Sequence, residues 1–289
     1  MPTMEKYVVL EKEVGETPLS CTERFRMTRS DLAGVPLSYA GRLDPMASGK
    51  LLILIGEECK HQADYHGLDK EYEFSVLFGI ASDTHDVLGR LHTERTVGAL
   101  FAVGGVGVVG EANSAPTVLE SELIKISNSL IGNLTFPYPL FSAKTVKGKP
   151  LHMWTLEGRL DEIEIPTRTS TIYELELVSV ETKPRQEIAA SALQKINTIP
   201  EVTDPRKALG NDFRRADVRA DWQDVATDFS LPAEYTLAHF RCVASSGAYM
   251  RTLATIIAEK CGTIGLAYHI HRTKIGHFEP QNKVWSREF

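Results

Sequence analysis

The feature that most constrains this fold is the segment at residues 39–49, which reads Tyr-Ala-Gly-Arg-Leu-Asp-Pro-Met-Ala-Ser-Gly. It leads into the apolar run at residues 51–55, which is too short for a helix and predicts a buried strand. Glycine permits unusual backbone angles and proline restricts them, so a loop rich in both can hold one side chain in a fixed pose. The carboxylate of this segment, Asp44, is therefore a candidate nucleophile or base. A solvated acid that starts a turn is the alternative.

The composition is that of an ordinary globular protein, with 289 residues of which 43% are hydrophobic and 24% are charged. That length allows one large domain or two modest ones with real cores. No apolar run approaches the roughly 20 residues that span a bilayer, and the N-terminus lacks the charged and then apolar pattern of a secretory signal. We therefore expect a cytoplasmic protein without membrane association.

The net charge limits the ways in which this chain could bind nucleic acid. A formal charge of −6, from 38 acidic and 32 basic residues, argues against a protein that coats nucleic acid nonspecifically. A local basic surface remains compatible with an acidic chain. Lys144, Lys147 and Lys149 lie close together and predict such a surface, with a solvated loop of lysines as the alternative.

Metal and disulfide chemistry find little support in the sequence. The four cysteines form no Cys-x-x-Cys pair, and we expect them to be reduced and mostly buried: Cys21, Cys59, Cys242 and Cys261. His269 and His271 would share one face of a strand, but no third ligand stands at a diagnostic spacing. We therefore expect no metal.

Periodicity predicts an alternation of strands and helices. Strand character recurs over residues 7–10, 51–55, 71–78, 171–178 and 238–243, of which 71–78 reads as half-buried. Helices are expected over residues 57–65, 117–130, 151–157 and 249–261, the last with the strongest apolar stripe. The helix at 117–130 would begin with the capping box Thr117-Val-Leu-Glu120. The Gly- and Val-rich residues 97–115 predict a strand pair or a loop.

Residues 184–235 differ in character from the strands on either side, because they are rich in charged and helix-forming residues. About 50 residues could bury only a marginal core alone, so we expect a helical insertion rather than a separate domain. Residues 1–289 would then form a single catalytic domain. The sequence does not reveal what the insertion does.

The loop around Asp44 resembles the active-site motif of the TruB family of tRNA pseudouridine synthases, Gly-x-Leu-Asp-Pro-x-Ala-x-Gly. The resemblance implies that Asp44 is catalytic. Further segments resemble family motifs in the same order, at residues 70–72, 82–89, 136–149, 245–251 and 271–278. Their joint occurrence is hard to attribute to chance.

The resemblance implies roles for individual residues. Tyr72 would stack on the target base and take part in proton transfer, and Asp86 would contact the base. Lys147 and Lys149 would contact phosphates. The remaining substrate contacts would come from Tyr39, Arg42 and Tyr249, and Arg251 would complete the catalytic group. Without the resemblance, a strand tyrosine, an Asx-type turn and a surface arginine paired with Glu259 are the alternatives for Tyr72, Asp86 and Arg251.

Arg251 also carries a physical prediction. A cation in the first turn of a helix opposes the helix dipole and needs an anionic partner. Asp44 would be such a partner, and the pairing would keep it ionised, as a nucleophile must be.

The chain departs from the family pattern in places. Tyr39 stands where the family usually has a histidine implicated in displacing the target base. The N-terminal motif keeps Lys12, Gly15 and Thr17 but ends in Pro18. We expect no C-terminal PUA-like RNA-binding module after Phe278.

The resemblance implies a mixed α/β protein of the α+β type with the pseudouridine-synthase fold, a predominantly antiparallel sheet with flanking helices around a central RNA-binding cleft. It implies a monomeric enzyme that isomerises uridine to pseudouridine at U55 in the T-arm of tRNA, with no cofactor. A synthase that acts on ribosomal RNA, and a tRNA-binding or tRNA-folding module with little activity, remain as alternatives.

Overall fold

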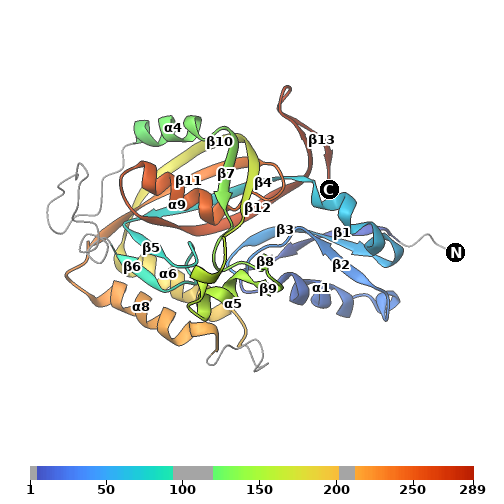
Figure 1. Ribbon diagram of the computed structural model, residues 1–289, viewed down its shortest axis with the longest axis horizontal. Coiled ribbons are helices and arrows are strands. Elements are labelled where there is room, and N and C mark those ends of the chain that lie inside the picture. Colours follow the sequence, from blue (N-terminus) through green and yellow to red (C-terminus); the bar gives the residue numbers. More distant parts are fainter. Residues whose placement is uncertain (1–4, 94–119, 202–211) are drawn as a thin grey trace.

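The computed structural model describes residues 5–93, 120–201 and 212–289 (Figure 1). Within these residues the centre is a nine-stranded sheet in the order β1-β3-β12-β4-β11-β10-β7, with β2 paired to β3 and β13 paired to β12. Its strands are β1 Tyr7–Lys12, β2 Leu37–Ala40, β3 Ser48–Ile55, β4 Asp69–Phe78, β7 Gly132–Pro137, β10 Thr167–Pro184, β11 Glu234–Ala244, β12 Gly265–Glu279 and β13 Val284–Glu288. Two small hairpins pair β5 Ile80–Ser82 with β6 Leu91–Thr93, and β8 Thr145–Val146 with β9 Lys149–Pro150.

The helices cover this sheet. They are α1 Pro18–Met27, α2 Gln62–His66, α4 Glu120–Ser129, α5 Leu151–Leu156, α6 Arg185–Thr198, α8 Arg215–Thr227 and α9 Met250–Lys260, with short 3₁₀ turns at Ser30–Leu32, Gly56–His61, Leu160–Glu162 and Asp212–Arg214. Helix α9 packs on β12 and β4, and α4 packs on β10. In the view of Figure 1, α4 lies above the strands, and α6 and α8 lie below them. None of the described helices is long and apolar enough to cross a membrane.

The sheet is mostly antiparallel, which confirms the expected fold class. The exception in the main sheet is the parallel pair β3–β12, where Ser48 lies opposite His271 and Gly49 opposite Arg272. Gly49 has a φ of +107°, and a Cβ there would come within 2.5 Å of the Arg272 backbone nitrogen. A residue with a side chain could not make this approach, so the glycine ties the Asp44 loop to the last long strand.

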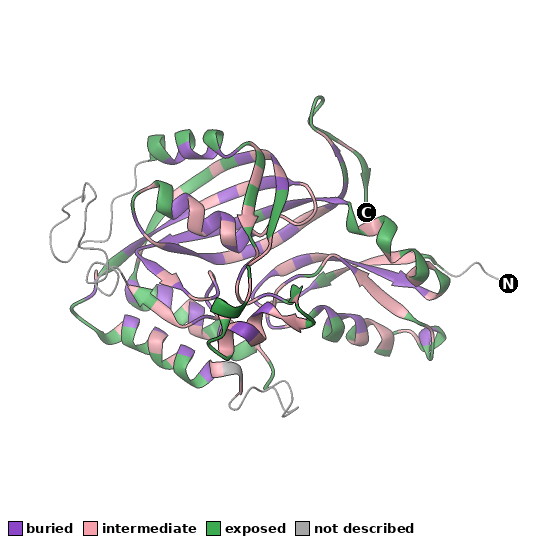
Figure 2. Cartoon of the chain, in the orientation of Figure 1, coloured by how far each residue is buried: buried purple, intermediate pink, exposed green. Residues whose placement is uncertain are grey.

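Most predicted elements are present, and the differences have simple causes. The predicted strand at 51–55 is extended to β3, and that at 171–178 to the 18 residues of β10. The expectation that 71–78 is half-buried is wrong, because β4 is a central strand and only Glu73 is exposed (Figure 2). The expected helix at 57–65 is a 3₁₀ turn followed by α2. The start of the capping box at Thr117 and the Gly- and Val-rich residues lie outside the described residues.

The helix with the strongest predicted apolar stripe, α9, lines a cavity of the molecule with its first residues. Leu253 and Ile257 are buried on its inner stripe, and Tyr249 occupies the N-cap position. Gly262 follows the helix with a φ of +74°, a left-handed conformation that favours glycine at helix ends. The helix therefore presents its first turn, with Arg251, at a defined place.

Helices α6 and α8 contribute to the main core rather than forming a core of their own. Their buried residues belong to one cluster with Phe74 of β4 and Phe240 of β11: Ile188, Ala189, Ala192, Ile196, Val218, Trp222 and Val225. All four cysteines are free; Cys21 and Cys242 are buried, whereas Cys59 and Cys261 are partly exposed, so fewer are buried than expected.

Candidate active site

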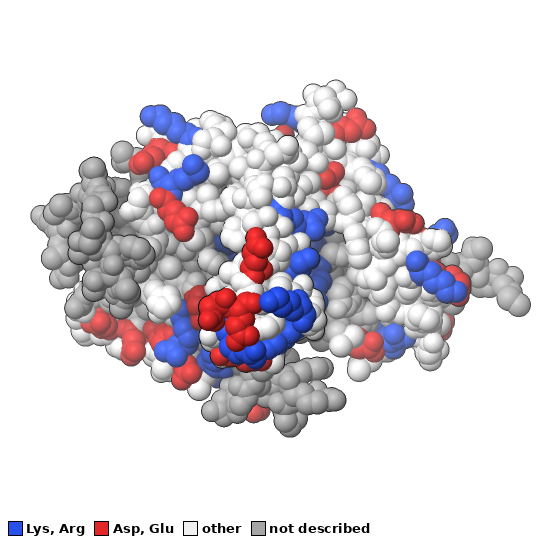
Figure 3. Space-filling model, viewed as in Figure 1, with Lys and Arg blue, Asp and Glu red and all other residues white. Residues whose placement is uncertain are grey.

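A cavity of about 860 Å³ lies where segments far apart in the sequence meet. Its wall combines the end of β2, the loop before β3, strand β4, the start of α9 and part of β12. The wall includes residues predicted from the sequence: Tyr39, Arg42, Asp44, Tyr72, Tyr249 and Arg251. Figure 3 shows lysine and arginine side chains gathered along a hollow near the middle of this face.

Asp44 and Arg251 form the ion pair that the helix-dipole reasoning predicts. The Arg251 Nε donates a hydrogen bond of 2.7 Å to Asp44 Oδ2. The Arg251 side chain is only 4% exposed, whereas that of Asp44 is 42% exposed, so the carboxylate faces the cavity and the guanidinium lies behind it. The Arg251 Nη1 also donates to the carbonyl of Thr84 at 2.7 Å. Burial lowers the pKa of Arg251, but the charges of Asp44 and Asp86 outweigh it and hold the pKa above its ordinary value.

Asp86 lies beneath Arg251 rather than on the cavity wall. Its carboxylate is buried and accepts hydrogen bonds from Thr84 Oγ1 at 2.6 Å and from the Leu88 amide at 2.9 Å. Asp86 Oδ2 lies 3.7 Å from Arg251 Nε. Burial raises the pKa of Asp86 to about 6, although Arg251 partly offsets it. The structure therefore places this aspartate as a support for Arg251, and its contact with the target base stays a prediction.

The raised pKa of Asp86 predicts a pH dependence of stability. Between the pKa of an unfolded aspartate, about 3.9, and the folded value of about 6, the folded state holds a proton that the unfolded state has released. The contribution of this proton to the free energy of unfolding is fully present below about pH 3.9. It is lost as the pH rises through about 6. The Asp86→Asn variant lacks this loss. Relative to wild type, we expect its free energy of unfolding to rise by on the order of 3 kcal/mol between about pH 4 and about pH 7.

Urea unfolding of both proteins across this pH range measures the difference directly. Asp31→Asn is a suitable control, because Asp31 is an exposed acid paired with Arg29 at the surface. A constant difference between the Asp86→Asn variant and wild type at all pH values would contradict the prediction.

Tyr72 and Arg272 form the floor of the cavity from adjacent strands. Tyr72 of β4 is 9% exposed and lies opposite Arg272 of β12 in the sheet register. Burial raises the pKa of Tyr72, and Arg272 only partly counteracts this, so the phenol is neutral at physiological pH. Arg272 itself donates to the carbonyls of Lys50 at 2.7 Å and Gly41 at 3.1 Å. It thereby holds the loop that carries Asp44.

The remaining aromatic residues of the wall lie at the ends of elements. Tyr39 is the penultimate residue of β2, and its carbonyl accepts a hydrogen bond from Gln62 Nε2 at 2.8 Å. Tyr249 caps α9, and its ring lies edge-on to that of Tyr138 with 5.8 Å between centroids. Arg42 lies in the loop between the end of β2 and Asp44. These positions give the cavity several apolar faces beside one carboxylate.

Lys147 and Lys149 are not on the cavity wall. Lys147 Nζ donates to the Glu162 carbonyl at 2.8 Å, and Lys149 forms an ion pair with Glu157 at 2.5 Å. The cations that do line the cavity are Arg42, Lys70, Lys144, Arg168, Arg251 and Arg272. Burial lowers the pKa of Lys70 to about 8.

Sequence reasoning singled out neither Lys70 nor Arg168 nor Arg272 as a site residue. Lys70 and Arg272 stand inside motif-like segments, at residues 70–72 and 271–278, and could have been found there. Arg168 lies in no such segment; it reaches the cavity because β10 runs beside β11, and its Nη2 donates to the Ser246 carbonyl at 2.9 Å.

The cavity places one carboxylate among aromatic and basic side chains, as an enzyme active site would, and comparison with known proteins identifies the family. Residues 33–101 and 106–195 match the family model described as TruB family pseudouridylate synthase, N-terminal domain. The match covers more than half of the chain, and the protein belongs to the TruB family of pseudouridylate synthases. The resemblance drawn from the motifs is thus confirmed.

Individual relatives agree with the family model. The chain is 25% identical over 276 residues to tRNA pseudouridine synthase B of Caldicellulosiruptor saccharolyticus. The aligned region covers 96% of this chain and 69% of that protein. It is 24% identical over 286 residues to tRNA pseudouridine synthase B of Aquifex aeolicus, which covers 99% of this chain and 74% of that protein.

The fold is also similar to that of a solved structure. A chain in the crystal structure of a Cbf5-Nop10-Gar1 complex superposes with a TM-score of 0.50 at 14% identity. The superposition covers 94% of this chain and 49% of that chain, so the present chain spans about half the length of the solved one. This similarity concerns the fold alone.

Proposed function

We propose that this protein isomerises uridine to pseudouridine in tRNA, at U55 of the T-loop, with Asp44 as the nucleophile. One observation carries the proposal: among the described residues that line the cavity, Asp44 is the only acid, and a buried arginine donates a hydrogen bond to it. Membership of the TruB family supports the reaction class. Relatives that are named tRNA pseudouridine synthase B support tRNA as the substrate.

The proposed reaction uses Asp44 at the ribose. Its carboxylate attacks or otherwise assists departure at the anomeric carbon, and the N-glycosidic bond breaks. The detached uracil turns and bonds to C1′ of the ribose through C5, which displaces Asp44 where the carboxylate is bound there. C5 then loses its proton and N1 gains one, so the net reaction is an isomerisation. Arg251 donates a hydrogen bond to Oδ2 of Asp44, which orients the carboxylate. The proposed chemistry requires no cofactor.

Recognition is proposed to combine stacking with charge. The target base must leave the stack of a folded loop at a cost of a few kcal/mol. A ring such as that of Tyr72 can return about 1–3 kcal/mol per stacked base. Arg42, Lys144 and Arg168 on the cavity wall are placed to contact phosphates, which adds affinity more than sequence preference. We further propose that a monomer binds the T-arm.

Product mapping tests this proposal. The purified protein is incubated with an unmodified tRNA transcript, with the same transcript carrying cytidine at position 55, and with a ribosomal RNA fragment. Pseudouridine is then located by carbodiimide labelling. We expect product at U55 of the first transcript alone. Product only in the ribosomal fragment, or tight tRNA binding with no product, would contradict the proposal.

A further inference from the structure

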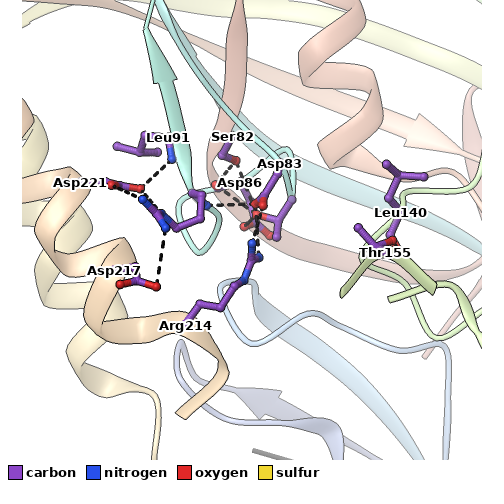
Figure 4. A network of polar contacts seen from close by, with 11 residues as sticks. Ser82, Asp83, Asp86, Leu91, Leu140, Thr155, Arg214, Asp217 and Asp221 are labelled. Atoms are coloured by element: carbon purple, nitrogen blue, oxygen red, sulfur yellow. Dashed lines mark hydrogen bonds and ion pairs between the residues drawn. The ribbon is translucent and has the colours of Figure 1, made fainter. Parts of the chain in front are cut away.

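Helix α8, in the region for which the sequence indicated no role, contacts the segment at residues 83–91 at three places. Figure 4 shows the contacts of Arg214 and Asp221. At the start of the helix, Arg214 pairs with Asp83, with 2.5 Å between Nη1 and Oδ2. In its second half, Asp221 accepts hydrogen bonds from Arg90 Nε at 2.7 Å and from the Leu91 amide at 3.0 Å. Trp222 lies fully buried beside Asp221, and its indole nitrogen donates to the Val87 carbonyl at 3.0 Å.

The same segment, residues 83–91, also contacts Arg251. The Thr84 carbonyl accepts from Arg251 Nη1, and the Asp86 carboxylate lies 3.7 Å from Arg251 Nε. The backbone conformation of this segment is constrained at two positions. His85 has a φ of +63°, and a Cβ on Gly89 would come within 2.4 Å of Thr84 Oγ1. The placement of the Thr84 carbonyl therefore depends on what holds this turn in shape.

Asp83 closes the turn and connects it to α8. Its Oδ1 accepts from the Arg90 amide at 3.0 Å, and the Asp83 amide donates back to the Arg90 carbonyl at 3.2 Å. Arg214 binds both oxygens of the same carboxylate, with the longer contact at 3.4 Å. Because a planar guanidinium binds both carboxylate oxygens, the pair fixes the orientation of the Asp83 carboxylate as well as its distance from Arg214.

Arg214 also touches the cavity wall. Its guanidinium carbon lies 4.4 Å from the ring centroid of Phe141, and Phe141 lines the cavity. Arg214 has a φ of +65°, a left-handed conformation that residues with a Cβ adopt where surrounding contacts enforce it. One side chain thus contacts both the turn beneath Arg251 and a residue of the cavity wall.

We propose that Arg214 is a positioning residue for the reaction, which acts on Asp44 through Asp83, Thr84 and Arg251. The inference rests on the proposed function and extends it. Loss of Arg214 frees the Asp83 turn, which lets the Thr84 carbonyl move and lets Arg251 reorient. Small displacements of a catalytic group far from the substituted residue can lower the rate by up to about 10²-fold.

The test compares Arg214→Ala, Arg214→Lys and a control on the same helix, Arg219→Ala. Arg219 bonds to Asn197 of α6 at 2.8 Å, outside the network that reaches Arg251. For Arg214→Ala we expect the single-turnover rate on tRNA to fall by about 10- to 100-fold while tRNA affinity stays within about 3-fold of wild type. Arg214→Lys should recover part of the rate, because lysine keeps the positive charge but cannot bind both carboxylate oxygens as the guanidinium does. Arg219→Ala should match wild type.

The pH profile separates positioning from a general loss of structure. If Arg251 reorients, its pairing with Asp44 weakens, and the acid limb of the rate profile should move to higher pH in Arg214→Ala. Asp83→Asn should reproduce the rate loss, and the double variant should be no slower than either single variant. If Arg214→Ala does not fold, the rate of Asp83→Asn alone decides the question: a wild-type rate in folded Asp83→Asn overturns the inference.

Three results would overturn the inference: a wild-type rate in folded Arg214→Ala, an unshifted acid limb with a rate that falls only as the folded fraction falls, or additive effects of Asp83→Asn and Arg214→Ala. Failure of the proposed function has a different signature. In that case wild type forms no pseudouridine in tRNA, or Asp44→Asn retains full activity, whatever Arg214 variants do.

Discussion

Replacement of Asp44 by asparagine is expected to lower the rate of pseudouridine formation by at least about 10⁴-fold and to leave the protein folded. The amide is nearly the same size as the carboxylate but is not a nucleophile. The Asp44 side chain is 42% exposed, so its replacement leaves no large cavity in the core. Arg251 keeps its hydrogen bond to the Thr84 carbonyl and its proximity to Asp86 in the variant.

Single-turnover kinetics with an excess of enzyme over tRNA measure this loss without interference from product release. Thermal unfolding and tRNA affinity are measured on the same samples and are expected to stay close to wild type. The matched control is Asp31→Asn, an exposed aspartate paired with Arg29 outside the cavity. A rate for Asp44→Asn within about 10-fold of wild type would exclude Asp44 as the nucleophile.

Replacement of Arg251 by methionine is expected to damage both stability and activity. Removal of one partner from a buried ion pair costs about 3–5 kcal/mol, because the other charge is left buried without compensation. Here that charge is on Asp86, which lies 3.7 Å from Arg251 Nε. The loss of a group that orients the reacting carboxylate should lower the rate by about 10²- to 10³-fold in addition.

A second substitution separates the two effects. In the Arg251→Met variant, the further substitution Asp86→Asn removes the buried charge. It should therefore recover a large part of the lost free energy of unfolding, which guanidinium denaturation measures. It cannot restore the hydrogen bond to Asp44 Oδ2, so the rate should stay low. Recovery of the rate together with stability would show that Arg251 acts only as a structural residue.

Sequence reasoning succeeded where the cause was local. The apolar run at 51–55 could only be a buried strand, and the apolar stripe with its closing glycine defined α9. The ion pair between Asp44 and Arg251 was also predictable, because a cation in a first helical turn requires an anion and the motif-bearing loop offers one.

Sequence reasoning failed where the cause was distant. The resemblance implied a base contact for Asp86, and the alternative was a solvated turn residue, yet packing against Arg251 and the sheet buries it. The sequence did not show that Lys147 bonds to the Glu162 carbonyl and Lys149 pairs with Glu157, and the phosphate contacts of both lysines stay predictions. Exposure depends on which segments pack together, and periodicity within one segment carries no information about that.

The sequence by itself indicated the reaction class of this protein and singled out Asp44 as the candidate nucleophile, because motif order and the constrained loop around Asp44 are properties of the linear chain. Only the tertiary structure decided how that carboxylate is held. Residues 83–91 reach α8 through pairs separated by about 130 positions, such as Arg214 with Asp83 and Asp221 with Arg90. Contacts of that range arise from the register of the sheet and the packing of the core, so only the folded chain reveals that α8 supports the loop beneath Arg251.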